Sequence, residues 1–285
     1  MDSFGNVQGR VWNCKFGSTA AVRKGQLLFC QSQAGVEWTQ KMLKRKVNAQ
    51  RRLLEDCLEM HCGDDFMQSR TVARALRRLQ LLAKRLEGFE ASEQMLDCDD
   101  ALRGIEGTAS RTYFQAVAAM LPRHLEFEKR QQRPSHDVVN AMLNYAYAIL
   151  YNKVETALIK AGIDPAVGLL HSDNYNTPVF SFDMIEPYRF IADAVVFDMA
   201  LSGEVDKNMG HYVEENQAFM LDTPLRKQLA ARVLAQLKGE YEEDAGVNHL
   251  YQLRLETQRL AQTFKSFYKK YKNEKKKQVC NSHKR

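Results

Sequence analysis

The segment from 171 to 186 carries an imidazole and three carboxylates, those of His171, Asp173, Asp183 and Glu186. Upstream, Glu106 lies in a segment that is expected to be helical. Imidazole and carboxylate groups are suitable ligands for Mg²⁺ or Mn²⁺, which favour oxygen donors and leave water positions open for a substrate phosphate. Such a site would suit phosphodiester chemistry. A histidine beside acids also occurs by chance in many loops, so the spacing alone leaves both interpretations open.

The position of Glu186 directly before Pro187 indicates how this segment ends. Proline disfavours the α-helical conformation in the residue before it and itself suits the first turn of a helix. Glu186 is therefore expected at a helix start, with Asp183 on the strand or turn that leads into it. Arg189 could pair with one of these acids or contact a phosphate. The alternative for either acid is a structural role as an N-terminal helix cap.

Basic residues recur at three- and four-residue spacing in two segments that are expected to be helical. They are Lys41, Lys44, Arg45, Arg51 and Arg52 in the first segment, and Arg70, Arg74, Arg77 and Arg78 in the second. Each helix could present a cationic stripe to nucleic-acid phosphates. Exposed charge balanced by salt bridges is the alternative for both. The candidates for phosphate contact are Lys44, Arg45, Arg74, Arg78 and Arg189.

The elements that must position these side chains are expected to be mainly helical. From Val36 onward the chain is rich in Leu, Ala, Arg, Lys, Gln and Glu and has only six prolines, which favours helices. The expected helices span residues 36–61, 67–87, 91–121, 136–161, 187–201, 222–238 and 246–272. The segment 162–188 combines Gly, Pro, Asn, Asp and aromatic residues, and we predict a long non-helical connection, a kind of segment that is often functional.

The two ends of the chain differ from this helical body. In residues 1–35, the short apolar runs GRVWNCKF and GQLLFCQ predict two strands or a hairpin. Residues 266–285 hold eight Lys or Arg and one Glu, so they carry +7 and leave the rest of the chain near −1. We predict that this tail is disordered and contacts DNA nonspecifically, docks on a partner, or only aids solubility. The expected domains are a short β element (1–35), a helical domain (36–265) and the basic tail (266–285).

Composition limits the class of protein. With 285 residues, 45% hydrophobic and 27% charged, the chain can bury a core, which excludes a disulfide-stapled miniprotein and a wholly disordered chain. The six cysteines form no C-x-x-C pair, which predicts reduced thiols. The sequence has neither a membrane-length apolar run nor a secretory pattern at residues 1–10, so we expect a cytoplasmic protein. It also has no P-loop, nucleophile elbow or Rossmann glycine fingerprint.

Four ordered motifs give the chain a resemblance to a known family. They read EGTASRTYF at 106–114, NAMLNYAYAIL at 140–150, GIDPAVGLLH at 162–171 and FSFDMIEPYR at 180–189. Together, over about residues 36–265, they resemble the CRISPR-associated protein one family, the integrase of spacer acquisition in prokaryotes. The resemblance implies a mainly α fold, a helical integrase domain preceded here by a short residual β element.

The resemblance also implies roles for particular residues. Glu106, His171 and Glu186 match the family positions that hold the divalent metal, Mg²⁺ or Mn²⁺, and that act as the catalytic site. Asp183 matches a second acid beside the metal. Tyr113, Asn140 and Tyr147 match positions that line either the site or the core.

The activity that the resemblance implies is metal-dependent integration and cleavage of double-stranded DNA. The 3′-hydroxyl of a short DNA, the prespacer, attacks a phosphodiester of the CRISPR repeat, and no covalent protein intermediate is needed. The implied partners are prespacer and repeat DNA, a second copy of the chain in a homo-oligomer, and CRISPR-associated protein two. A usual member opens with a β-domain about twice as long as residues 1–35, so this chain is either a compact variant or part of a longer or fused polypeptide. The alternatives are a general metal-dependent nuclease on branched or repair DNA and a non-catalytic DNA-binding scaffold.

Overall fold

The structure, a computed structural model, describes residues 19–61, 66–90, 95–132, 134–170, 177–240 and 248–282. Its α-helices are α1 (Thr19–Cys30), α2 (Gln33–His61), α3 (Phe66–Glu87), α4 (Met95–Met120), α5 (Val138–Ala161), α6 (Val179–Ile185), α7 (Arg189–Leu201), α8 (Thr223–Lys238) and α9 (His249–Ser282). Short 3₁₀ turns are η1 (Arg123–Leu125), η2 (Glu186–Tyr188) and η3 (Glu214–Asn216). Two strands, β1 (Gly210–Val213) and β2 (Ala218–Leu221), complete the described elements. The mainly α fold class is thereby confirmed.

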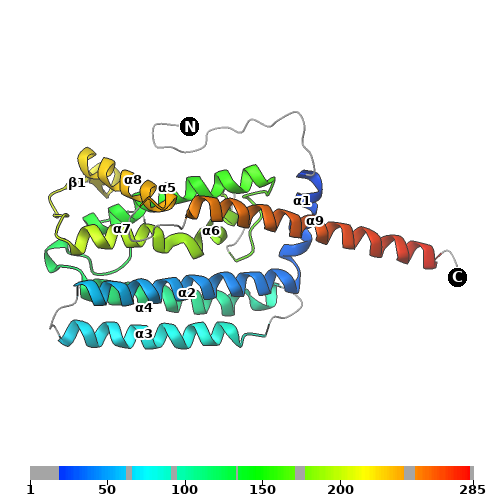
Figure 1. Ribbon diagram of the computed structural model, residues 1–285, viewed down its shortest axis with the longest axis horizontal. Helices are drawn as coiled ribbons and strands as arrows, with labels where there is room; N and C mark the ends of the chain where they lie inside the picture. The colour runs from blue at the N-terminus through cyan, green and yellow to red at the C-terminus, as the bar shows by residue number, and fades with distance from the viewer. Residues whose placement is uncertain are drawn as a thin grey trace.

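The helices form two packed layers (Figure 1). Helices α2, α3 and α4 lie side by side in one layer. In the other layer α5 packs against α6, α7, α8 and α9. The layers meet where α2 contacts α7 and η2, so the segment that carries Glu186 lies at their junction. Among the described helices, none combines the length and the apolar character that a membrane crossing requires.

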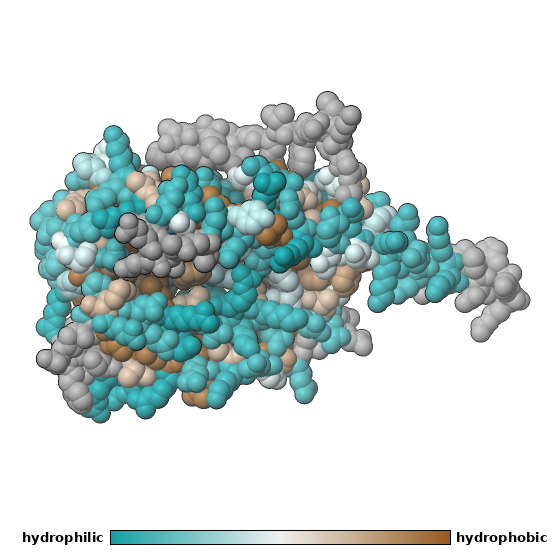
Figure 2. All heavy atoms as spheres, in the orientation of Figure 1, coloured by the Kyte–Doolittle hydropathy of each residue, from teal (hydrophilic) through white to brown (hydrophobic). Residues whose placement is uncertain are grey.

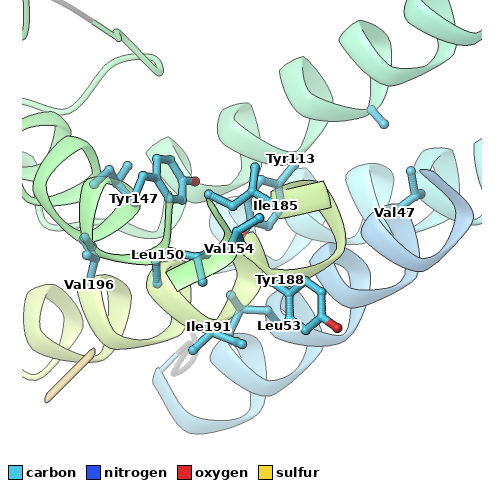
Figure 3. Close-up of a cluster of buried hydrophobic side chains, with 14 of the residues drawn as sticks. Val47, Leu53, Tyr113, Tyr147, Leu150, Val154, Ile185, Tyr188, Ile191 and Val196 are labelled. Atoms are coloured by element: carbon cyan, nitrogen blue, oxygen red, sulfur yellow. The ribbon is translucent and has the colours of Figure 1, made fainter. Parts of the chain in front are cut away.

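Apolar side chains from both layers form one core. Val47 and Leu53 of α2, Tyr113 of α4, Leu150 of α5 and Ile191 of α7 all belong to it (Figure 3). Burial of this surface supplies the main driving force for folding. The core also fixes α2, α4 and η2 relative to one another, and with them the polar side chains that these elements carry.

The strand expected in GQLLFCQ is wrong, because these residues belong to α1 and the linker after it. Val22, Gln26 and Phe29 recur at helical spacing and are buried, in a helix that packs against α9. Gly25 permits this packing, since a Cβ there would overlap the backbone oxygen of Phe264. The other apolar run, GRVWNCKF, lies outside the described residues.

Three further segments differ from the expectations. Asp183 lies in helix α6 and not on a strand or turn, so the connection 162–188 is partly helical, whereas Glu186 begins the 3₁₀ turn η2, as expected for a helix start. Up to Ser282 the basic tail continues α9 as helix, which makes the expectation of disorder wrong for these residues. Lysine favours helices, and extending a packed helix costs far less than nucleating one. Residues 210–221, expected as loop, form an antiparallel hairpin in which Gly210 pairs with Leu221.

Candidate active site

Two of the predicted metal ligands converge on one lysine ammonium. Glu106 comes from α4, Glu186 from η2, and Lys46 from α2. The Nζ of Lys46 lies 2.5 Å from Oε2 of Glu186 and donates a hydrogen bond to Oε1 of Glu106. Ser110, one turn after Glu106, donates to the same Glu106 oxygen at 2.8 Å. Residues 60 and 140 positions from Lys46 therefore meet at a single cation.

This ion cluster is largely withdrawn from water. The side chains of Lys46 and Glu186 are each 4% exposed, whereas that of Glu106 is 28% exposed and gives the cluster its open side. Burial alone would raise the pKa of Glu186, but Arg189 and Lys46 outweigh it and lower this pKa to about 2. The pKa of Lys46 is raised, because the attraction of Glu186 and Glu106 outweighs its desolvation. Lys46 and Glu186 are therefore both charged at neutral pH.

Arg189 holds the second oxygen of Glu186. Its Nε donates to Oε1 of Glu186 at 3.0 Å, and its Nη2 donates to the hydroxyl of Tyr151 at 3.0 Å. The guanidinium also lies over the ring of Tyr147, 4.7 Å from the centroid. The expected pairing of Arg189 with an acid is therefore present. Neither η2 nor α7 has a side-chain cap, so the capping alternative is wrong for Glu186.

Asp183 organises the backbone that leads to His171. Its Oδ2 accepts from the backbone N–H groups of Leu169, at 2.6 Å, and Leu170, at 3.2 Å. Arg103, on the same helix as Glu106, donates to the carbonyl oxygen of Leu170 at 3.2 Å. His171 itself lies outside the described residues. The residue before it is thus tied both to α6 and to the helix that carries Glu106.

The chemistry of this donor set fits a divalent cation. Two carboxylates already face one cationic centre, and Oε2 of the buried Glu186 has the ammonium of Lys46 as its ionic partner. Oxygen-rich positions of this kind suit Mg²⁺ or Mn²⁺. Among the described residues no group of three His, Cys, Asp or Glu side chains could hold a metal, and the third ligand expected here, His171, is not among them.

The expected tyrosines are core residues behind the ion cluster. Tyr113 and Tyr147 both donate their hydroxyl protons to the buried carboxylate of Asp193, at 2.9 Å and 2.5 Å. Figure 3 shows both rings among the buried apolar side chains. Burial raises the pKa of Asp193, whereas both tyrosine hydroxyls and two arginines lower it. Burial has the larger effect, and the pKa is raised to about 6. Tyr147 still borders the site, since its ring supports Arg189.

Asn140 shapes a neighbouring loop. Its side chain accepts from the backbone N–H of Gln131 at 2.7 Å and from Arg130 at 3.1 Å, and it donates to the backbone oxygen of Lys129 at 2.9 Å. Arg130 in turn lies 5.3 Å from the centroid of the Tyr147 ring. Asn140 therefore holds a half-buried arginine beside the tyrosine that supports Arg189.

The expected phosphate contacts fall into two groups. Lys44 pairs with Glu87 at 2.7 Å, and Arg45 pairs with Glu256 at 2.5 Å. Arg74 and Arg78 are exposed on α3. Contact of all four with DNA stays a prediction.

A family model described as CRISPR associated protein Cas1 matches residues 1–234. The chain belongs to the Cas1 family. A CRISPR-associated endonuclease Cas1 of Archaeoglobus fulgidus is 28% identical over 248 residues, which cover 84% of this chain and 70% of that protein. One of Thermus thermophilus is 40% identical over 120 residues, 40% of this chain and 36% of that protein. The chain thus aligns with 36% of the length of one of these relatives and 70% of the other.

Solved structures agree with this assignment of the Cas1 fold. A Cas1 protein from Thermotoga maritima superposes with a TM-score of 0.70 at 15% identity, covering 92% of this chain and 76% of that one. A structure described as a casposase bound to its integration product gives 0.70 at 20% identity, covering 93% of this chain and 70% of that one. At such low identities the likeness establishes the fold.

Sequence reasoning missed three polar residues of the Cas1 site: Lys46, Arg130 and Asp193. Lys46 stands in a run of three basic residues, but at helical spacing it shares a face with the buried Leu43 and Gln50. A lysine on a core-facing stripe demands a carboxylate partner, and this signal was available. Asp193 occupies the apolar stretch of α7 and carries the same kind of signal.

Proposed function

We propose that this Cas1 chain is a divalent-metal-dependent DNA integrase and endonuclease of CRISPR adaptation. It would insert the 3′-hydroxyl ends of short prespacer DNA into the repeat array. The observation that supports this most is the convergence of Glu106 and Glu186 on one cationic centre at the layer junction. Family membership supports the assignment to adaptation.

Three residues would hold Mg²⁺ or Mn²⁺: Glu106, His171 and Glu186. When bound, such an ion polarises phosphoryl oxygens and acidifies an attacking hydroxyl. Arg189 keeps Glu186 ionised and fixes its orientation through Oε1. That leaves Oε2, now facing Lys46, as the oxygen available to an incoming ion. Asp183 would position His171 through the two backbone N–H groups that it holds.

The proposed reaction is a transesterification. The O3′ of the prespacer forms a bond to phosphorus while the bond from phosphorus to the repeat O3′ breaks. The proton of the attacking hydroxyl ends on the departing oxygen, so one phosphodiester replaces another and no energy source is consumed. Lys46 and Arg189 supply positive charge beside the carboxylates, which favours the additional negative charge of the transition state.

The proposed partners are prespacer and repeat DNA, with a homo-oligomer that pairs two sites and with Cas2 as a possible third component. Insertion at both ends of a repeat requires two such sites at a fixed distance. Solved neighbours of this fold include chains titled as part of a Cas6-RT-Cas1–Cas2 complex. The exposed Arg74 and Arg78 on α3 are the proposed phosphate contacts outside the carboxylate cluster.

The same carboxylates could hydrolyse DNA if water replaced the 3′-hydroxyl, and the curated relatives are named endonucleases. Integration and cleavage should therefore be compared on one branched substrate with Mn²⁺. Covalent joining of the labelled strand supports the integrase. If the substrate is cleaved but no joined product forms, however much 3′-hydroxyl DNA is added, the result would favour the nuclease.

Metal binding distinguishes the proposed enzyme from the alternative, a scaffold subunit with a decayed site. Calorimetric titration of the wild type with Mn²⁺ should show a saturable site that His171→Ala and Glu106→Gln both weaken. Absence of binding in the wild type would contradict the proposed catalytic function.

A further inference from the structure

Helix α9 has two halves of opposite character. Its first half is anchored in the body, where Leu253, Leu260 and Phe264 are buried. Phe264 packs on Phe29 of α1 with ring centroids 5.1 Å apart. Phe267 also packs on Phe29, and the C-terminal part of the helix projects from the body as a rod (Figure 1). The buried half thus fixes the direction in which the projecting half points.

The projecting half carries a dense positive charge. Between 265 and 282 it holds one acid, Glu274, and seven lysines: Lys265, Lys269, Lys270, Lys272, Lys275, Lys276 and Lys277. Residues 269–277 are all exposed, and the face of this rod seen in Figure 2 is mainly hydrophilic. Lys265, Lys269, Lys272 and Lys276 line one shallow surface groove together with Tyr268. We call these four residues the lysine stripe.

The lysine stripe is uncompensated in the described part of the chain. None of its four ammonium groups has a carboxylate partner there, whereas Lys44, Lys46 and Lys207 all do. Lys272 instead lies over the ring of Tyr268, which Lys24 of α1 also approaches. Lysines at i and i+4 repel each other by about 0.2–0.5 kcal/mol per pair. The stripe contains two such pairs, so a polyanion that binds along it would stabilise the helix.

The stripe is long enough to meet several phosphates of a nucleic-acid backbone. Lys276 lies eleven positions after Lys265, which at a rise of about 1.5 Å per residue is roughly 16 Å. Duplex DNA presents one negative charge per roughly 1.7 Å of its axis. We propose that the lysine stripe is a sequence-independent clamp for the phosphate backbone of duplex DNA, separate from the carboxylate cluster.

The chemistry favours DNA over the other polyanionic partners. A membrane-bound helix needs an apolar face opposite its lysines, but residues 269–277 contain Tyr271 as their one aromatic or aliphatic residue. An acidic protein would be recognised by shape and apolar anchors at the centre of an interface, and this exposed surface offers few. Duplex DNA needs only spaced cations. The clamp goes beyond the proposed function, since it binds DNA without taking part in strand transfer.

The test measures binding of the full chain to a short labelled duplex of arbitrary sequence by fluorescence anisotropy over a range of salt. The variant Lys269→Gln/Lys272→Gln/Lys276→Gln should bind more weakly. Its slope of log affinity against log salt should be shallower by about one per lysine removed. Unchanged circular dichroism would show that the helix is retained.

A matched control removes three lysines elsewhere: Lys153→Gln/Lys160→Gln/Lys227→Gln. This control should keep the slope of the wild type, so a change confined to the stripe variant is assigned to the lysine stripe. Equal slopes in the stripe variant and the control would overturn the proposal. A stripe variant that binds DNA normally but loses binding to phosphatidylserine vesicles would overturn it as well, in favour of a lipid surface.

Discussion

Lys46 occupies the position between Glu106 and Glu186 at which a divalent ion would be held. Removing the ammonium leaves two carboxylates facing each other, one of them buried, with Arg189 as the remaining partner of Glu186. Breaking a buried ion pair in this way destabilises proteins by about 3–5 kcal/mol. We expect Lys46→Met to lose stability of this order without divalent ions. Thermal unfolding with and without Mn²⁺ checks it.

Mn²⁺ should restore more stability to Lys46→Met than to the wild type, because in the variant the ion no longer competes with the ammonium. Lys44→Met is the matched control, since Lys44 pairs with an exposed Glu87 at the surface. The control should show the Mn²⁺ response of the wild type. Equal Mn²⁺-induced shifts in the wild type and Lys46→Met would show that the ion does not bind at these carboxylates.

Asp193 should make the stability of the wild type depend on pH. Its pKa is raised from 3.8 to about 6 in the folded state, so between these values the native state binds the proton that the unfolded state has lost. Stability from this group is therefore present below about pH 4 and is lost as pH rises through 6. A shift of about two units corresponds to about 3 kcal/mol.

Asp193→Asn removes this titration while keeping an acceptor for the tyrosine hydroxyls. Between pH 4 and pH 7 the free energy of unfolding of the wild type should fall by about 2 kcal/mol relative to that of the variant. Unfolding in denaturant at both pH values measures this difference. Parallel pH profiles for the two proteins would mean that Asp193 keeps an ordinary pKa despite its burial.

The sequence predicted the acids of the site better than their partners. Glu106 and Glu186 were identified by type and by motif, and the structure brings both to one cation. Lys46 was not, because a lysine beside Lys44 and Arg45 resembles any solvated basic run. The helical spacing of Lys46 with Leu43 and Gln50 indicates that it is the one of the three that faces inward. Which carboxylates it meets there depends on tertiary contacts that no local pattern contains.

At the scale of elements, the contact between α1 and α9 requires a residue without a side chain at position 25, which is Gly25. A Cβ at Gly25 would overlap the backbone oxygen of Phe264, which cannot rotate away. Gly25→Ala should therefore cost about 1–3 kcal/mol or more through overpacking. Gly104→Ala in α4 is the control, because a Cβ at Gly104 would meet no other atom within 4 Å, and it should stabilise by about 0.5–1 kcal/mol. Chemical denaturation compares them, and equal effects would contradict this packing.

Long periodic helices were predicted well and short elements poorly. The expected helix at 222–238 matches α8 within one residue. Helix α6 has seven residues and follows Pro178, so it offers too little periodicity to predict. In α1, the apolar run Leu27, Leu28 and Phe29 is typical of a strand. The helical spacing of the buried Val22, Gln26 and Phe29 instead indicates the helix that the structure shows.

On the scale of the whole molecule, α2, α4 and η2 meet where the two helical layers are in contact. The lysine-rich end of α9 projects from the body as a rod (Figure 1). The core fixes the carboxylates, and the rod offers a second place at which DNA can be held. These roles are separable, because the carboxylate cluster lies at the junction of α2, α4 and η2 while the lysine stripe lies beyond Phe264 at the far end of α9. A loss of chemistry and a loss of DNA affinity should therefore map to different variants.

The most direct test of the central claim is strand transfer of a short 3′-hydroxyl DNA into a supercoiled plasmid that carries a repeat, in the presence of Mn²⁺. The account predicts that the wild type joins the strands, with Cas2 added where pairing of sites requires it. Glu186→Gln should lose at least about 100-fold in rate, since loss of groups that merely support metal ligands already costs roughly 10- to 100-fold. Glu126→Gln, an exposed carboxylate paired with Lys207, should keep full activity. Undiminished strand transfer by a folded Glu186→Gln variant would contradict the assignment of the site.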